Sequence, residues 1–196
     1  MATIGLDKLY YASITDSTSG ETYGTPTLLA KAISVDLSVE LNEATLFADD
    51  GLAEAVKEFK GGTISLNVDD IGPSVAAALV GATVDQNGVL VSAGEDTPKH
   101  VAIGFRARKS NGKYKYFWFY RVLFGLPATN LQTKGDSINF ATPTIEGTIF
   151  RRLKAANDGK HPWKAEVTED GTNTSIISAW FTTVYEPDNT PGPNTL

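Results

Sequence analysis

The chain contains no cysteine, two histidines and one methionine among its 196 residues. The lack of cysteine excludes disulfides and thiol chemistry. No apolar run approaches the roughly 20 residues that a membrane-spanning helix needs. The first residues also lack a basic region followed by a long apolar stretch, so we expect no signal peptide. These absences lead us to expect a soluble protein that is made in the cytoplasm and does not bind a membrane.

The usual catalytic signatures are missing as well. There is no nucleophile elbow, no phosphate-binding glycine loop and no His-Glu-x-x-His motif. His100 and His161 lie among proline and lysine residues near expected strand starts, and we interpret them as surface residues rather than a metal pair. The Asp85–Gly88 segment lacks the later glutamate of a calcium loop and is interpreted as a turn. The sequence therefore predicts no enzyme, no metal site and no cofactor.

Acidic residues are concentrated in one stretch. Residues 33–70 hold nine carboxylates and only two lysines, whereas the rest of the chain is almost neutral. The whole chain has a net charge of −6, which argues against a protein that binds nucleic acid by neutralising phosphates. A protein past which nucleic acid must slide would instead favour this sign.

The acidic stretch contains two segments with strict alternation of apolar and polar residues, Ile33–Asn42 and Thr63–Asp69. Alternation of this kind predicts strands with one apolar side and one polar side. The connection between them, residues 43–62, is too long for a tight turn. Helix propensity rises over 51–59, but an irregular or extended conformation stays open.

Other segments predict a mainly β protein with one helix. The helix is expected over Ile71–Gly81, with Pro73 in its first turn and Gly81 at its end. Residues 16–26 are expected to form a loop, and 175–185 either a strand or a helical turn. The remaining expected strands are Lys8–Thr15, Val89–Ala93, Ser137–Arg152 and Trp163–Val167.

Asn111-Gly112 predicts a β-hairpin with a two-residue loop. The aromatic and basic stretch Lys113–Arg121 could form a base-stacking surface, but its alternation favours packing in a core. Phe117 and Phe119 would face the opposite side, so we expect this sheet to be covered on both sides. The pairs expected from the two-residue loop are Ala107–Tyr116, Phe105–Trp118, Ile103–Tyr120 and Val101–Val122.

Together these elements predict an antiparallel β-sandwich or barrel with one short α-helix and a long hairpin loop. We expect a single domain over residues 1–187, including an extended loop at 43–62. The last residues, 188–196, are rich in proline and are expected to form a flexible tail.

The order of these features resembles the major tail proteins, or tail-tube proteins, of long-tailed bacteriophages with non-contractile tails. The resemblance runs from about Thr3 to Pro187. It is carried by the opening segment Ile4–Ala12, the long acidic hairpin, Gly61-Gly62-Thr63, and the closing segment Trp180–Pro187. No single piece is a sharp motif, and the order and total length carry the likeness.

The resemblance implies a structural virion protein without catalytic residues. Six copies would form a ring, sheets of neighbouring subunits would join into one barrel, and rings would stack into the tail tube through which DNA is ejected. Implied partners are further copies of the chain, the tape measure and other tail proteins, while DNA passes without specific binding. The implied location is the virion tail, assembled in the bacterial host cytoplasm.

Two groups of site residues follow. Residues predicted to face the lumen are Ser34, Asp36, Ser38, Glu40, Ser65, Asn67 and Asp69, with Ile33, Val35, Leu37, Val39, Ile64, Leu66 and Val68 facing the core. Residues predicted to contact the adjacent ring are Leu46, Phe47, Leu52, Val56 and Phe59. A polar side that simply meets bulk solvent stays open, as do a tail terminator or neck ring protein and a carbohydrate-binding β-sandwich module.

Overall fold

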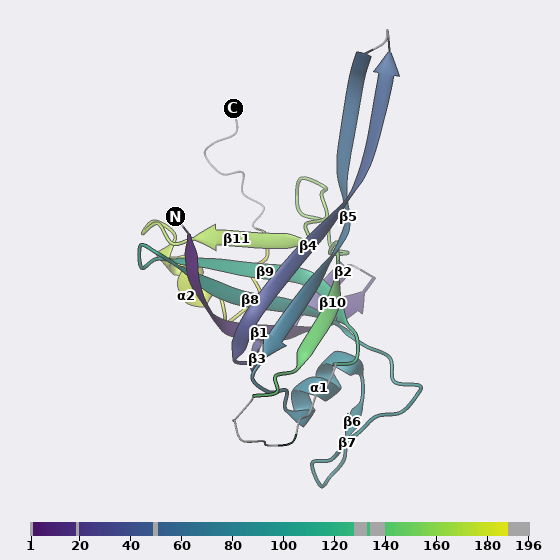
Figure 1. Ribbon diagram of the computed structural model, residues 1–196, viewed down its shortest axis with the longest axis vertical. Helices are drawn as coiled ribbons and strands as arrows, with labels where there is room; N and C mark the ends of the chain where they lie inside the picture. Colours follow the sequence, from purple (N-terminus) through teal and green to yellow (C-terminus); the bar gives the residue numbers. More distant parts are fainter. Residues whose placement is uncertain (1, 19, 49–50, 128–132, 134–139, 188–196) are drawn as a thin grey trace.

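Alternating and β-branched segments build one large antiparallel sheet in the computed structural model, which describes residues 2–18, 20–48, 51–127, 133 and 140–187. The sheet follows the strand order β2-β1-β8-β9-β10-β5-β4, with β3 added to β1 and β11 added to β9 (Figure 1). The fold class is thus mainly antiparallel β, as predicted, but the sheet is open and does not close into a barrel. The strands are β1 (Thr3–Ser17), β2 (Gly20–Tyr23), β3 (Thr27–Ala30), β4 (Ala32–Ala48), β5 (Gly51–Val68), β6 (Thr83–Val84), β7 (Leu90–Val91), β8 (His100–Lys109), β9 (Tyr114–Phe124), β10 (Thr144–Phe150) and β11 (Lys164–Thr168).

The described residues contain two helices, α1 (Pro73–Val80) and α2 (Thr174–Ala179). The first matches the helix expected over 71–81, and it ends where Gly81 adopts a left-handed conformation with φ of 80°. The second shows that the segment 175–185 begins as a helical turn and not as a strand.

Several expected boundaries were wrong. Residues 16–26 do not form a loop throughout, because β1 continues to Ser17 and pairs with β2. Of the conformations left open for residues 43–62, the structure has the extended one, because β4 and β5 stay paired from Ala32–Val68 to Ala48–Gly51, and the helix propensity over 51–59 does not produce a helix in the described residues. The part of the expected 137–152 strand from 137 to 139, and the tail 188–196, lie outside the described residues.

The register of the β8–β9 hairpin differs from the expected one. Gly112 has φ of 80°, and the amide of Lys109 donates to the carbonyl of Lys113, so three residues lie in the loop instead of two. The extra loop residue moves each pairing by one position. Phe105 therefore faces Phe117, Gly104 faces Trp118, and Arg108 faces Tyr114. The repulsion between Arg108 and Lys115 that the two-residue loop implies is avoided.

A β-bulge then restores the expected register at the other end of the hairpin. Val101 pairs with Val122 and Ile103 with Phe119, so two residues of β9, Tyr120 and Arg121, lie opposite Ala102 alone. At a bulge of this kind, the side chains of the two residues that share one partner project to the same side of the sheet. The bulge therefore turns the charged side chain of Arg121 toward β1 and β2.

Each side of the sheet has its own apolar core, as expected for a sheet covered on both sides. One core includes Phe105, Phe119, Ile64 and Leu66, with α1 packed on it. The other is formed by Tyr116, Trp118 and Tyr120, covered by Trp180 and Val184 from the segment that follows α2. The Trp118 indole donates to the carbonyl of Trp180 at 2.9 Å, which ties this segment to the sheet.

Candidate functional site

Strands β4 and β5 form a ribbon that extends well beyond the rest of the sheet (Figure 1). Its proximal part pairs with β10, whereas its distal part, residues 41–58, pairs only with itself among the described residues. An isolated two-stranded hairpin is marginally stable in water at best. A ribbon of this length that stands clear of its own domain is therefore typical of a segment that contacts another molecule.

The polar residues of the two strands do gather on one side of the ribbon. Strand register places Ser34 opposite Asn67 and Asp36 opposite Ser65, and residues directly opposite each other share a side. The third strand continues this side with Thr144 and Glu146, which face Asn67 and Ser65. The outcome is a polar surface three strands wide, which we call the polar side. Its residues are Ser34, Asp36, Ser38, Glu40, Thr63, Ser65, Asn67, Thr144, Glu146 and Thr148.

Two of the predicted lumen-facing carboxylates have partners. Glu40 forms an exposed ion pair with Lys60 at 3.1 Å. Asp69 lies just after the end of β5 and accepts hydrogen bonds from the amides of Lys31 and Asp70. The hydrogen bond from Lys31 lowers the pKa of Asp69. Whether the polar side lines a lumen stays a prediction.

The apolar side of the ribbon is buried on one strand and exposed on the other. Ile64, Leu66 and Val68 of β5 are fully buried. On β4, by contrast, Ile33, Leu37 and Val39 are 53%, 42% and 40% exposed. The reason is that β4 is the last strand of the open sheet, with no neighbour beyond it among the described residues. The expectation that these three side chains face the core is therefore wrong for the single subunit, while half-buried Val35 packs against the core.

A groove opens beside these exposed side chains. It has a volume of about 440 Å³ and lies between the apolar side of β4 and the first half of β1, with β8 and β9 as its floor. As the last strand of the sheet, β4 presents unpaired backbone donors and acceptors beside an apolar surface. This combination favours pairing with another chain. The lining residues are Thr3, Gly5, Leu6, Ile33, Ser34, Val35, Leu37, Phe105, Ala107, Phe117 and Phe119.

The residues predicted to contact an adjacent ring differ in their surroundings. Leu46 and Val56 are 58% and 45% exposed. Phe59 is half-buried and stacks on Trp163, with ring centroids 4.6 Å apart. Its ring thus has a partner in its own subunit, and an additional contact with another ring stays a prediction. Phe47 and Leu52 pair through their backbones, and their side chains lie outside the described part.

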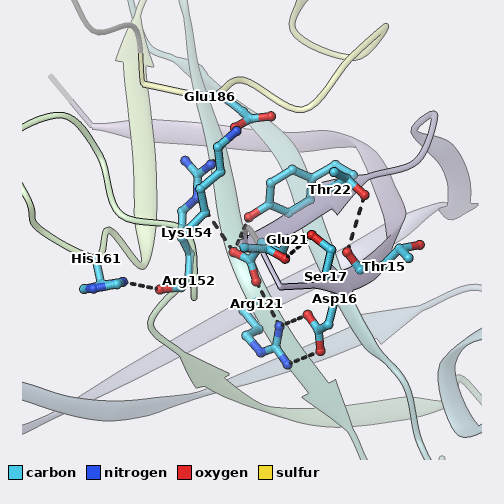
Figure 2. Close-up of polar contacts among 12 residues, drawn as sticks. Thr15, Asp16, Ser17, Glu21, Thr22, Arg121, Arg152, Lys154, His161 and Glu186 are labelled. Carbon is cyan, nitrogen blue, oxygen red and sulfur yellow. Dashed lines mark hydrogen bonds and ion pairs between the residues drawn. The ribbon is translucent and has the colours of Figure 1, made fainter.

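Sequence reasoning missed a buried network of charged residues (Figure 2). Arg121 donates to Glu21 at 2.8 Å and forms two hydrogen bonds with Asp16 at 2.7 and 2.9 Å. Glu21 and Arg152 are almost fully buried. Arg152 donates to Glu186 at 2.5 Å, which connects the end of the described chain to the sheet.

The network has electrostatic consequences. The hydrogen bond from Arg121 lowers the pKa of Asp16 and raises that of Arg121 itself. Burial raises the pKa of the Tyr23 hydroxyl, which donates to Glu21 at 2.7 Å, and burial lowers the pKa of His100. Arg121 lies within the aromatic run of β9. Its position could have indicated the network from the sequence, because a buried charge requires a partner. These contacts connect β1, β2 and β9.

Further observations bear on other kinds of site. Within the described residues, no group of three or more His, Cys, Asp or Glu is placed to hold a metal ion. No helix in the described ranges is long and apolar enough to cross a membrane. Asp85 accepts hydrogen bonds from the amides of Asn87 and Val89, as in the turn expected there.

Comparison with models of protein families and with curated proteins finds no match for this chain. Two solved structures resemble it in fold. One is the tube terminating cap of the anti-feeding prophage, with a TM-score of 0.45 and 9% identity, covering 86% of this chain and 93% of that one. The other is a chain of the PVC sheath-tube complex, an extracellular contractile injection system in its extended state, with a TM-score of 0.41 and 8% identity, covering 85% and 92%. Scores and identities this low carry no argument about function.

Proposed function

We propose that this protein is a structural subunit that assembles into stacked rings, forming the tail tube through which phage DNA is ejected into the host. The observation that carries the proposal is the β4–β5 ribbon, which projects from the body with apolar side chains exposed at Leu46 and Val56. Exposed apolar side chains on a projecting element are typical of contact sites between proteins.

The open sheet supports assembly within a ring. Strand β4 offers a free edge and exposed apolar side chains at Leu37 and Val39. Both would be covered if the sheet of a neighbouring copy continued that of the first. Ring formation of this kind removes the exposed edges that make an open sheet prone to aggregation.

The polar side supports the role of a channel wall. Asp36 and Glu146 place negative charge among hydroxyl and amide groups, and the Lys60 that lies near Glu40 is held in an ion pair. Because DNA is densely negative, a wall of this composition repels it and provides no phosphate clamp. In this proposal the polar side of each copy lines the lumen.

Electron microscopy of the purified protein over a range of concentrations tests the proposal. Tubes of stacked rings would support it, with the polar side on the inner wall. Single rings that never stack would point to a terminator or neck ring protein instead. A protein that stays monomeric at every concentration would overturn the proposal.

A matched pair of variants tests the ribbon. Replacing Leu46 and Val56 with serine should leave a folded subunit and prevent stacking, because the distal ribbon supports no core of its own. Val89→Ser is the control, since Val89 is similarly exposed at 54% but lies in the β6–β7 region. Normal tube growth by the Leu46→Ser/Val56→Ser variant would exclude the ribbon from stacking.

A carbohydrate-binding module is disfavoured by the placement of the tryptophans. Such a module should show a shallow patch with exposed tryptophan or tyrosine, and the seven tyrosines are all buried or half-buried. Trp118 and Trp180 are buried, and half-buried Trp163 has its ring stacked against Phe59. The chain contains no further tryptophan.

A further inference from the structure

One side of the distal ribbon combines apolar side chains with carboxylates that have no ion-pair partner within the described residues. Strand register places Asn42 opposite Glu58, Ala44 opposite Val56, and Leu46 opposite Glu54. We call this surface the docking side and define it by its exposed residues. These are Ala44, Leu46, Glu54, Val56 and Glu58.

The charges on the two sides of the ribbon differ. Glu43 lies on the opposite side from Leu46, where it forms an ion pair with Lys57 at 3.2 Å. Among the described residues, neither Glu54 nor Glu58 forms an ion pair. The docking side thus carries two uncompensated negative charges next to Leu46 and Val56.

The groove beside β4 has the complementary composition. Its floor is formed by Phe105, Ala107 and Phe117. Lys109 follows Ala107 by two positions, so it lies on the same side of β8 as the floor. Lys113 lies directly before β9, next to Lys109, with which it shares a backbone hydrogen bond of 2.8 Å. Two lysines therefore lie where the apolar floor ends.

Lys109 and Lys113 differ from the neighbouring Lys115 in whether they form ion pairs. Lys115 lies on the same side and forms an ion pair with Glu166 at 2.8 Å. Within the described part of the chain, Lys109 and Lys113 form no ion pair. Arg108 has the opposite orientation by strand alternation, because it lies between Ala107 and Lys109.

The groove also offers backbone groups. The first residues of β1, Thr3–Asp7, pair with β8 on one edge only, and β4 pairs with β5 on one edge only, as far as the described residues extend. The groove is bounded by these two free edges. Since the proposed ring places a neighbouring copy at the β4 edge, an extended segment in the groove can add hydrogen bonds at Thr3–Asp7 of β1 to its apolar contacts, as in recognition by strand addition.

We propose that the docking side of one copy binds in the groove of a second copy. Leu46 and Val56 lie against the aromatic floor, while Glu54 and Glu58 pair with Lys109 and Lys113. This inference rests on the proposed self-assembly and identifies the surface that receives the ribbon. Because the two surfaces differ, the contact is heterologous, and each bound copy leaves its own groove and ribbon open for the next.

Charge reversal provides the test. A Glu54→Lys/Glu58→Lys variant carries lysines both on its docking side and at its groove. A Lys109→Glu/Lys113→Glu variant carries glutamates at both places. Each alone should lose tube formation, measured by sedimentation and electron microscopy. An equimolar mixture should restore tubes, because each variant's ribbon is attracted to the other variant's groove. Arg108→Glu, on the other side of the hairpin, is the control and should assemble normally.

The outcomes separate this inference from the proposed function. Tubes formed by both reversed variants alone would overturn the docking site and leave the tube function standing. Loss of assembly in both variants without recovery in the mixture would also overturn it. A wild-type protein that never assembles would instead overturn the proposed function.

A disulfide experiment provides an independent measurement. The chain has no native cysteine, so Val56→Cys and Thr3→Cys create the only thiols. Thr3 lines the groove next to Lys109. Under mild oxidation the double variant should form a ladder of linked copies, whereas Val56→Cys with Val89→Cys should not. Equal ladders from both pairs would contradict the specific contact.

Discussion

Gly104 lies directly opposite Trp118, and the indole ring occupies the space where a side chain at residue 104 would lie. A Cβ at this position would come within 2.8 Å of three ring carbons. Trp118 is fully buried and belongs to the core that Trp180 and Val184 cover. The absence of a side chain at Gly104 is therefore a condition for this core.

We expect Gly104→Ala to lower the free energy of unfolding by about 1–3 kcal/mol, the usual range for overpacking a core. Urea unfolding followed by tryptophan fluorescence measures the change. Gly94→Ala is the control, because a Cβ added at Gly94 would meet no heavy atom within 4 Å and the residue has no positive φ. Equal stability of the two variants would contradict the close contact.

The buried charge network predicts a loss of stability when Glu21 is replaced. Replacing Glu21 with glutamine removes the buried carboxylate that faces Arg121 and Arg152. Because Arg121 keeps Asp16 and Arg152 keeps Glu186 as partners, we expect a loss smaller than the roughly 3–5 kcal/mol that a buried charge without any partner costs. Asp158→Asn provides the comparison, since its pair with Lys160 is exposed and surface ion pairs contribute little to stability. Similar unfolding midpoints for the two variants would show that the network does not stabilise the fold.

Asp16 predicts a loss of stability in acid. Its folded-state pKa lies below its unfolded value of about 3.9 because Arg121 donates to its ionised form. The resulting stabilisation is complete above the unfolded pKa and is lost as the pH falls through the folded pKa. Unfolding curves between pH 7 and pH 2 should therefore show Asp16→Asn less stable than wild type near neutrality, with the difference shrinking below about pH 4. A constant difference across this range would contradict the assignment.

The polar side predicts how a tube would treat DNA. Replacing Asp36 and Glu40 with lysine should leave assembly intact and make tubes retain DNA in a salt-dependent way, because lysines release counterions from phosphates. Co-sedimentation of short DNA with assembled tubes at low and high salt measures this. A double variant with Glu95→Lys and Asp96→Lys makes the same charge change in the 92–96 loop, where Glu95 is exposed and Asp96 is half-buried. Equal retention by the two variants would argue against a lumen lined by the polar side.

The β8–β9 hairpin shows most clearly how the register expected from the sequence differs from the register in the structure. Asn111-Gly112 correctly predicted a turn, yet a two-residue and a three-residue loop both accept glycine in the left-handed region. The three-residue loop then moved Phe117 and Phe119 to the side of Phe105. The expected pair Val101–Val122 was nevertheless confirmed, because the bulge at Tyr120 and Arg121 compensates for the longer loop.

The amino-acid sequence alone determined the proximal strands of the ribbon, its polar side and helix α1, because alternation and helix-ending residues act locally. Only the tertiary structure decided that Leu37 and Val39 are exposed, since burial of a strand depends on which strand lies next to it. It also decided that Arg121 meets Glu21, a residue 100 positions away in the chain. Such contacts arise from the packing of distant segments, and no local pattern encodes the distance between them.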